Sequence, residues 1–475
     1  MSVSANQLRG SIGVAGIVFL VVAAASPLTT VAGSLPVMIA LGNGAGAPLT
    51  YIIAALVLLV FSVGYAAMSS AVTDTGAFYA YVTKGLGSNL GVGAAGLAVF
   101  AYTTVQAGVY GLAANTIQSL VVKYGGPALP WWIWAFALMA VVGVVGYRNI
   151  DVGARVLGVL LILEIVAIVA LSVAVFAKGG AHGIDFTSFT PGAFFSGSPG
   201  IAMMIAIGSF VGFEATAIYS EEAKNPKRTV PVATYVAIIV IGVLYAVSSW
   251  AVVLAFGSDQ VAGAASQDTA GLTFSAAAQY LSPAAADAMA IMLVTSLFAT
   301  LLAFHSAISR YLFALARRGY APARLASVHA KHGSPHAGSL LQSASAVVLV
   351  GIFALVGADP VLQLFTWMAG VAIVAILALM VLTSFAIIAY FRRTSADTRL
   401  WHTRVAPLLG SLGLIAITAL VIDNFTTLIG GSATIANIFL GSVVLVFVGG
   451  IIAGRMVHAR RARTLSHPEP ATSRT

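Results

Sequence analysis

Cysteine is absent from the 475-residue chain, and charged residues make up only 8% of it. Without cysteine the chain has no disulfide bonds, no thiolate metal ligands and no cysteine nucleophile. Because 60% of its residues are hydrophobic, the chain carries more apolar surface than one water-soluble core can bury. The composition therefore excludes a soluble or disulfide-stabilised domain and predicts an all-α polytopic membrane protein.

Apolar runs of about 20 residues recur along the chain, each long enough to cross the ~30 Å hydrocarbon core of a bilayer. We expect about twelve transmembrane helices and no soluble domain. The first run resembles a signal peptide, but it continues past Pro27 to Leu41 and is therefore expected to remain as a span. A sixth span is expected around residues 208–231, preceded by spans near 11–41, 48–70, 85–121, 131–146 and 155–176, and followed by spans near 232–256, 284–316, 337–356, 361–390, 407–425 and 433–457.

The net charge of +9 is unevenly distributed among the loops. Lysine and arginine gather in alternate loops, as at 224–228, 310–331 and 392–404, whereas the other loops hold only Lys123 and Lys178 among several aspartates. This is the positive-inside pattern, which predicts that both termini lie in the cytoplasm. The basic residues are thus expected to contact phospholipid head groups rather than nucleic acid.

The stretch 208–231 reads GSFVGFEATAIYSEEAKNPKRTVP and combines helix-weakening glycines with a carboxylate inside an apolar run. Gly208 and Gly212 destabilise a helix, and hydrocarbon tolerates Glu214 poorly. Broken backbone at membrane depth is found where it lines protein or a water-filled cavity, and its free N–H and C=O groups can then bind a substrate. We expect the sixth span to be broken at this point.

The first span carries a second candidate break, ASPLTT at 25–30. Pro27 removes a backbone donor, while Ser26, Thr29 and Thr30 offer hydroxyl ligands. The alternative is a continuous, proline-kinked helix whose hydroxyls bond back to their own turns. Two broken spans at corresponding positions of two halves are typical of an inverted-repeat transporter with its binding site between them.

Other polar residues in the spans have more than one interpretation. Tyr102, Gln106 and Tyr110 are spaced four apart on one helical face, where they could line a substrate path or, more commonly, pack between helices. His305 could relay protons, although a histidine hydrogen-bonded between helices is the commoner case. For each of these residues the sequence allows both interpretations.

Glu164 and Glu214 are the two acidic residues that we place deep in the bilayer. Burial favours the neutral form of a carboxyl group, so either residue could hold a proton and release it when water enters. This property suits a proton-coupled carrier. A purely structural glutamate is the alternative for each.

Three motifs together resemble the amino acid–polyamine–organocation permeases over nearly the whole chain. They are TGAFYAYV at 75–82, in an expected cytoplasmic loop after the second span, Gly212-Phe213-Glu214 with EEAKNPKRTVP at 221–231, and SRYLFALARRGYAP at 309–322. The resemblance implies a LeuT-like fold of two inverted five-helix repeats, at 11–177 and 196–391, followed by two helices at 405–457 and a polar tail at 458–475.

The resemblance also implies a substrate site in the unwound parts of the first and sixth spans. Phe210 would be an aromatic lid over the substrate. Glu164 stands roughly where several proton-coupled relatives have a lysine between the first, fifth and eighth spans, so it would carry the coupling proton or, with Ser296 or Thr300, help to hold sodium. The implied substrate-binding residues are Ser26, Pro27, Leu28, Thr29, Thr30, Phe210, Val211, Gly212, Phe213 and Glu214, to which we add Tyr102 and Gln106 as the nearest polar groups of the third span.

We therefore expect a secondary transporter of the cytoplasmic membrane that imports an amino acid or related amine together with protons. The alternatives are a sodium-coupled carrier, an exchanger of the same fold, or a sensor that binds solute without moving it. An enzyme is the weakest alternative, because the sequence has no nucleophile–base pair and no His/Asp/Glu cluster with metal-ligand spacing. We expect no cofactor and no metal, and the sequence leaves the oligomeric state open.

Overall fold

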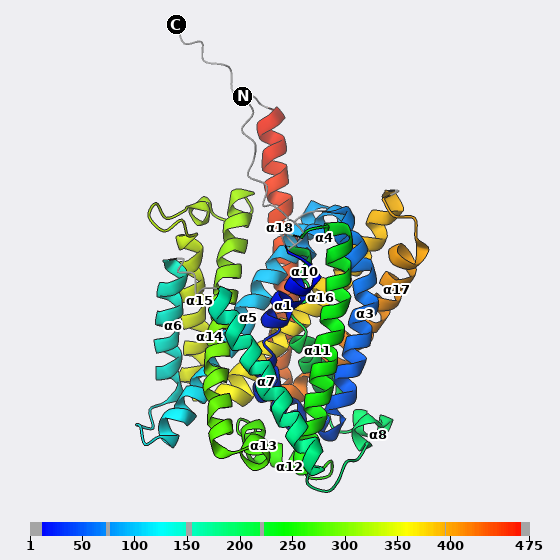
Figure 1. The fold of residues 1–475 in the computed structure, drawn as a ribbon. Coiled ribbons are helices and arrows are strands. Elements are labelled where there is room, and N and C mark those ends of the chain that lie inside the picture. Colours follow the sequence, from blue (N-terminus) through cyan, green and yellow to red (C-terminus); the bar gives the residue numbers. More distant parts are fainter. Residues whose placement is uncertain (1–11, 73–76, 149–153, 219–222, 395, 467–475) are drawn as a thin grey trace.

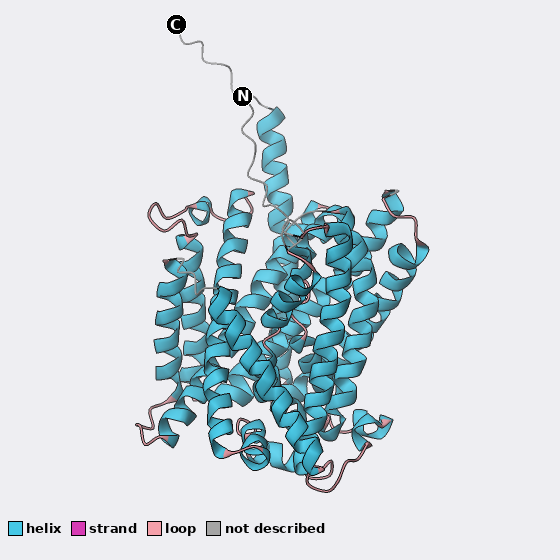
Figure 2. Ribbon diagram, in the orientation of Figure 1, coloured by secondary structure: helices cyan, strands magenta, loops and turns pink. Residues whose placement is uncertain are grey.

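The structure is a computed structural model that describes residues 12–72, 77–148, 154–218, 223–394 and 396–466. Within these ranges the chain forms helices and no β-strand (Figure 2). Ten of the described helices are long and apolar enough to cross a membrane, and Trp131–Tyr147 and Pro199–Ser209 are shorter apolar helices. The prediction of an all-α polytopic membrane protein is confirmed. Residues 11, 75–76, 221–222 and 467–475, which belong to predicted spans, motifs or tail, lie outside the described ranges.

The described residues of the first part of the chain form nine helical elements. They are α1 (Val14–Ala24), η1 (Thr29–Ser34), α2 (Leu35–Leu41), η2 (Gly44–Gly46), α3 (Ala47–Ala71), α4 (Ala77–Leu86), α5 (Ser88–Lys123), α6 (Trp131–Tyr147) and α7 (Ala154–Lys178).

The second part continues the bundle. Its elements are η3 (Thr187–Phe189), α8 (Pro191–Phe194), α9 (Pro199–Ser209), α10 (Ala215–Ile218), α11 (Pro226–Phe256), α12 (Val261–Gln267), α13 (Leu272–Tyr280), α14 (Pro283–Arg317), η5 (Ala323–Ala326), α15 (His336–Leu355), η6 (Pro360–Phe365), α16 (Thr366–Arg393), η7 (Trp401–Val405), α17 (Ala406–Leu428) and α18 (Ala433–Ser466).

The helices form a bundle in which α1 and α16 are interior and α18 is peripheral (Figure 1), and most residues of α9 are buried. In the span that contains α16, 72% of the most apolar stretch is buried by protein, whereas the corresponding value for α18 is 11%. In lipid an apolar helix face needs no protein cover, so α18 presents its exposed isoleucines and valines outward. The interior helices are therefore the ones that can enclose a site.

Small residues set the close helix approaches, as expected where hydrocarbon removes the hydrophobic drive for association. A Cβ atom added at Gly450 of α18 would lie 2.8 Å from the Cα atom of Gly93 in α5. One added at Gly85 of α4 would lie 2.1 Å from the carbonyl oxygen of Ala386 in α16. These backbones therefore touch, and a larger residue at either glycine would push the helices apart.

The expected loop at 73–81 is wrong for its described part, because residues 77–86 form helix α4. Phe78 and Tyr81, three residues apart, share a face and are both buried. Their rings pack at 5.6 and 5.2 Å from the ring of Tyr65 in α3. This burial stabilises a helix too short to form alone, which the polar flanks in the sequence obscured.

The described chain begins and ends at the same end of the bundle (Figure 1). That end also carries α4 and α10, while α8, α12 and α13 lie at the opposite end. Helix α18 continues past the predicted end at residue 457 as far as Ser466. The arrangement places both described ends on one side, as the alternating charge pattern requires.

Candidate functional site

The first span is broken between α1 and η1. Ser26 has φ +45°, a left-handed conformation that non-glycine residues rarely adopt, and Pro27 follows it directly. The hydroxyl of Tyr245 donates to the freed carbonyl oxygen of Ala25 at 3.0 Å. The discontinuous helix is confirmed, and the kinked but continuous alternative does not fit this geometry.

The sixth span is broken between α9 and α10, as predicted, but it begins at Pro199 rather than near residue 208, and residues 226–231 belong to α11. Gly212 has φ +115°, which only glycine adopts without strain. A Cβ atom at this position would lie 3.0 Å from the Cβ atom of Ala24. The two breaks are therefore in contact at the centre of the bundle, and glycine is required there for conformation and for space.

Glu214 holds the unwound turn of the sixth span together. Its Oε2 atom accepts a hydrogen bond of 2.8 Å from the backbone N–H of Gly212, and its Oε1 atom accepts one of 3.4 Å from the hydroxyl of Tyr102. The hydroxyl of Tyr65 donates to the backbone carbonyl of Glu214 at 2.8 Å. The side chain is buried, and these bonds satisfy the backbone groups that the break exposes.

A cavity of about 100 Å³ lies where the two breaks meet. Its polar lining consists of hydroxyl groups, and no charged side chain of the described residues lines it. The hydroxyl oxygen of Thr29 is buried without a hydrogen-bond partner. Because buried polar atoms normally have partners, this oxygen marks a place for a ligand atom. The hydroxyl residues of the lining are Ser26, Thr29, Thr30, Ser34, Ser209, Thr300 and Thr366.

Five of the predicted site residues line this cavity, and the others lie behind it. Ser26, Thr29 and Thr30 come from the first span, Val211 from the sixth and Thr300 from α14. The predicted residues that do not line it are Pro27, Leu28, Tyr102, Gln106, Glu164, Phe210, Gly212, Phe213, Glu214 and Ser296.

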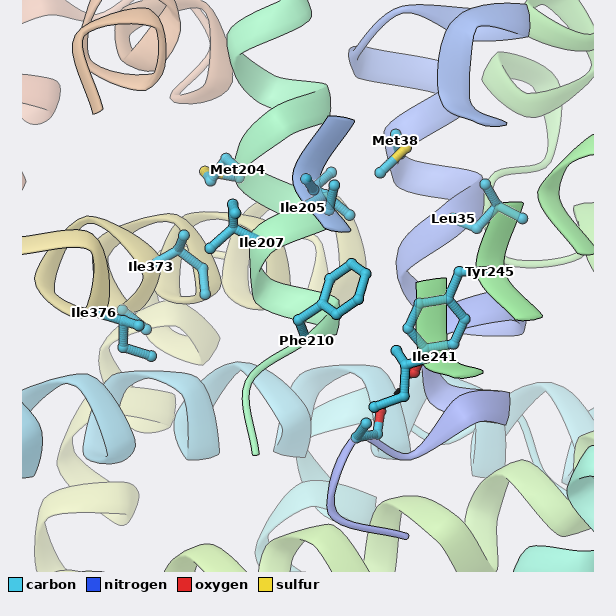
Figure 3. Packing of buried hydrophobic residues seen from close by; sticks show 14 of the residues in the cluster. Leu35, Met38, Met204, Ile205, Ile207, Phe210, Ile241, Tyr245, Ile373 and Ile376 are labelled. Carbon is cyan, nitrogen blue, oxygen red and sulfur yellow. Dashed lines mark hydrogen bonds between the residues drawn. The ribbon is translucent and has the colours of Figure 1, made fainter. Parts of the chain in front are cut away.

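Phe210 stands at the break, but its ring packs away from the cavity. The ring lies 6.0 Å from that of Tyr245 in an edge-on contact, and its tip is 3.7 Å from where a Cβ atom of Gly242 would be. Figure 3 shows the ring on the side of Tyr245 and Leu35, opposite Ile373 and Ile376. The lid role stays a prediction, and it requires this ring to swing from its present position.

Tyr102 and Gln106 contact neighbouring helices. The Tyr102 ring lies 5.7 Å from that of Phe304, a lining residue. The amide of Gln106 donates to the carbonyl oxygen of Leu301 at 3.1 Å and accepts a bond from Gln342. Tyr102 thus supports the cavity wall from behind, whereas Gln106 ties α5 to α14 and α15.

His305 also serves an interhelical contact. Its Nε2 atom is 2.7 Å from the hydroxyl of Ser339 in α15, and the ring fills the space beside Gly146 in α6. It does not line the cavity. The geometry fits the commoner interpretation, a histidine that packs between helices.

Glu164 lies on α7 one contact behind the cavity. Its carboxyl group is buried and lies beside the side chain of Ser296 and the backbone of Leu28. It therefore joins the first span, α7 and α14, the three elements expected from the resemblance.

Ser296, beside this carboxyl group, is linked to the cavity by hydrogen bonds of Thr300. The hydroxyl of Thr300 donates to the carbonyl oxygen of Ser296 at 2.9 Å and lies 2.8 Å from the hydroxyl of Ser26. Both of these hydroxyls line the cavity. A change at Glu164 can thus reach the cavity through Ser296 and Thr300.

The apolar lining was not predicted from the sequence. Val105 and Val109 of α5 are turned toward the cavity, next to the predicted face of Tyr102 and Gln106. Within the remaining apolar lining, the sequence pointed to Gly208, because Gly208 belongs to the glycine-containing stretch 208–231. The other apolar lining residues come mainly from α9 and α16, namely Met204, Ile205, Ala369, Ile373 and Ile376.

Two broken helices that meet at a cavity within a bundle of apolar helices are typical of the binding site of a membrane transporter. The amino acid permease family matches residues 16–467, so the chain belongs to that family. This confirms the resemblance identified in the sequence. Because a permease is a transporter, membership sets the enzyme alternative aside.

Three relatives show the range of the family. The chain is 24% identical over 308 residues to the branched-chain amino acid permease BcaP of Bacillus subtilis, covering 62% of this chain and 64% of BcaP. It is 29% identical over 241 residues to the aromatic amino acid transport protein AroP of Escherichia coli, covering 47% and 50%. It is 22% identical over 213 residues to the aspartate–proton symporter of Bacillus subtilis, covering 43% and 40%. The matched parts span less than two thirds of each relative.

Proposed function

We propose that the protein is a secondary active transporter that imports an amino acid across the cytoplasmic membrane by alternating access, driven by protons. The observation that carries the proposal is the contact between the two helix breaks, Gly212 against Ala24, at the cavity. Unwound backbone inside a helical bundle is costly unless its groups are used, and substrate binding is such a use. Both termini are assigned to the cytoplasm from the charge pattern.

The two breaks offer ends of opposite polarity to a zwitterion. The second half of the first span starts after Ser26, so its positive dipole end and the unpartnered hydroxyl of Thr29 face the cavity. Helix α9 ends at Ser209, and its last carbonyl groups form the negative end. We assign the substrate carboxylate to the first end and its ammonium group to the second.

The breaks occupy corresponding places in two stretches of the chain, residues 11–177 and 196–391. We assign these stretches to two inverted five-helix repeats, with residues 405–457 as two further helices and 458–475 as a tail. Their symmetry would let one group of helices rock against the other around the cavity, so that it opens to each side in turn.

Glu164 is the proposed coupling residue. Its carboxyl group bridges the first span and α14, two elements that would move relative to each other during transport. Binding of a proton changes the charge at this junction, and the contacts through Ser296 and Thr300 carry the change to the cavity. Substrate and proton would then favour the same conformation.

The relatives support amino acid transport without selecting one substrate. Their names assign branched-chain amino acids, aromatic amino acids and aspartate to different members, and one name specifies proton coupling. The proton proposal for this chain rests on Glu164. A related amine or sodium coupling would be an outcome of the test below.

The test is uptake of radiolabelled amino acids, putrescine and ethanolamine into proteoliposomes that contain the purified protein. An inward proton gradient is expected to drive accumulation of an amino acid, and a sodium gradient at equal pH is not. Accumulation driven by sodium alone would overturn the coupling assignment. Exchange without net accumulation would identify an exchanger, and binding without flux would identify a sensor.

A further inference from the structure

We infer that the cavity selects small neutral amino acids with an aliphatic side chain and rejects charged and aromatic ones. This inference rests on the proposed function, because it concerns the substrate of the same site. Hydroxyl groups line the cavity mainly at the two helix breaks, and most of the other lining residues, on α5, α9 and α16, are apolar. That division fixes which part of a substrate can face which wall.

Hydroxyl groups are concentrated at the helix breaks. Ser26, Thr29 and Thr30 belong to the first break, Ser209 to the end of α9, and Thr300 lies 2.8 Å from Ser26. These groups suit the ammonium and carboxylate that all α-amino acids share. The substrate backbone is therefore held at the breaks, and its side chain points toward the rest of the cavity.

The rest of the lining is apolar and mainly aliphatic, with Val105 and Val109 of α5, Ile205 of α9, and Ile373 and Ile376 of α16. Phe304 and Phe365 also line the cavity. An aliphatic side chain gains contact with this wall and removes apolar surface from water. A polar side chain would lose hydration there without gaining a hydrogen-bond partner.

A charged substrate side chain has no counterion in this cavity, since no charged residue of the described chain lines it. The two nearby carboxylates are already engaged outside the lining. Glu164 lies beside Ser296 and Leu28, and Glu214 accepts hydrogen bonds from Gly212 and Tyr102. Lysine, arginine, glutamate, aspartate and diamines would bury an unpaired charge, so they are excluded.

Size excludes the larger neutral substrates. The cavity volume of about 100 Å³ is well below the ~300–1,000 Å³ of sites for larger ligands. Ile373 limits the space on one side because it seats against Gly208, where an added Cβ atom would lie 3.0 Å from its Cδ1 atom. Ile373 is therefore the residue that we assign to side-chain selection.

The experiment compares binding and flux for the purified full-length protein. Binding is measured by calorimetry in detergent for valine, leucine, phenylalanine, lysine, glutamate and putrescine, and flux by uptake of the same compounds into proteoliposomes. Valine or leucine is expected to bind at least about 100-fold more tightly than lysine, glutamate or putrescine, because these bring an unpaired charge into the cavity. Preferred binding of any charged compound would overturn the inference.

The two measurements separate this inference from the proposed function. Flux of a charged or aromatic amino acid in preference to an aliphatic one would support transport and overturn the selection. Binding of valine or leucine without flux would support the selection and overturn transport. Failure of every aliphatic amino acid to bind would overturn the selection.

Variants of Ile373 test its assigned role. Ile373→Ala is expected to weaken leucine binding by at least about tenfold, since one methylene in an apolar pocket contributes roughly that factor. The same change is expected to improve phenylalanine binding relative to leucine. Ile415→Ala makes the same chemical change at an exposed position of α17 and is expected to leave both affinities unchanged.

Ile373→Val is a milder variant that keeps the branched shape and protects the test against misfolding of the alanine variant. An intermediate loss of leucine binding is expected for it. Unaltered leucine and phenylalanine affinities in both folded variants would remove Ile373 from the selecting wall.

Discussion

Glu164 and Glu214 are both buried glutamates that the sequence places deep in the bilayer, yet their surroundings differ. Glu214 bonds to the amide of Gly212, two residues away in its own turn, and to Tyr102. Glu164 lies beside Ser296 of α14 and the backbone of Leu28 in the first span, both distant in sequence. The shorter bond of Glu214 closes a local turn, whereas the neighbours of Glu164 belong to elements that transport would move.

A position deep in the membrane is therefore not enough to make a carboxyl group a coupling residue. The shorter hydrogen bond of Glu214, to the amide of Gly212, lies within one turn and is kept through the cycle, so protonation there has little to act on. Its bond to Tyr102 of α5 is longer, at 3.4 Å. A group whose partners lie on separate elements loses or gains them when those elements move. On this basis we assign coupling to Glu164 and a structural role to Glu214, although both were candidates in the sequence.

The strongest test replaces the carboxyl group of Glu164 by an amide. Glu164→Gln keeps the size and polarity of the side chain but cannot exchange a proton, so accumulation driven by a proton gradient is expected to vanish while substrate binding persists. The measurement is uptake with and without the gradient, beside calorimetric binding.

Asp423→Asn is the matched control, an acid-to-amide change at an exposed position of α17. It is expected to transport as the unaltered protein does. Proton-driven accumulation that survives in Glu164→Gln would contradict the coupling role and leave Glu164 structural.

A substitution of Gly212 is expected to destabilise the turn that Glu214 closes. Gly212→Ala places a side chain at φ +115° and 3.0 Å from the Cβ atom of Ala24, at a cost of about 1–3 kcal/mol in conformational strain, with the crowding added to it. We expect a lower thermal unfolding temperature and reduced uptake. Gly192→Ala, where an added Cβ atom meets no atom within 4 Å, is the control, and equal loss in both variants would argue against strain at the break.

Removing the carboxyl group of Glu214 is expected to affect stability rather than coupling. Glu214→Ala leaves the amide of Gly212 without its acceptor, at a cost of about 1–3 kcal/mol in unfolding free energy. Glu214→Gln keeps an acceptor and should retain proton-driven uptake. If Glu214→Gln lost the response to the proton gradient while staying folded, the division of roles between the two glutamates would be wrong.

The smallest effect is expected for a carboxyl group at the surface. The Arg399 guanidinium beside Asp397, 2.7 Å away, holds the pKa of that carboxyl below its usual value. Its contribution to stability is therefore present above the unfolded-state pKa and is lost as the pH falls through the lower, folded-state pKa. Asp397→Asn should lower the unfolding temperature slightly at neutral pH and not at all in strong acid, since exposed pairs contribute only about 0–1 kcal/mol. A thermal melt series against pH would reveal any larger effect, which would mean that the pair is not solvent-screened.

Local chemistry made the two breaks predictable. Pro27 removes a donor and Gly212 allows a left-handed turn wherever they occur in a helix, so no knowledge of neighbours was needed. The same was true of helix α18 and the other apolar runs, which composition identifies by length. Helix α4 was missed because its stability comes from packing of Phe78 and Tyr81 on Tyr65, a contact between separate segments.

The apolar cavity wall was beyond prediction for a related reason. Ile373 lines the cavity and Ile387 lies in the packed core, yet both are isoleucines on the same helix. A helical face that looks toward a cavity has the same composition as one that looks toward another helix. On α5 the sequence pointed to Gln106, whereas Val105, the residue before it, lines the cavity.

The residue types along the chain were enough to predict that it spans a membrane many times and that two of its spans are broken. They also predicted which residues lie at the breaks. These properties follow from transfer of side chains into hydrocarbon and from backbone chemistry, both of which act within one segment. The contact between the breaks and the position of Glu164 beside Leu28 and Ser296 are visible only in the tertiary structure. The same is true of the apolar lining that accompanies the hydroxyl groups. Contacts between segments depend on how helices pack, and many sequences of similar composition would pack differently.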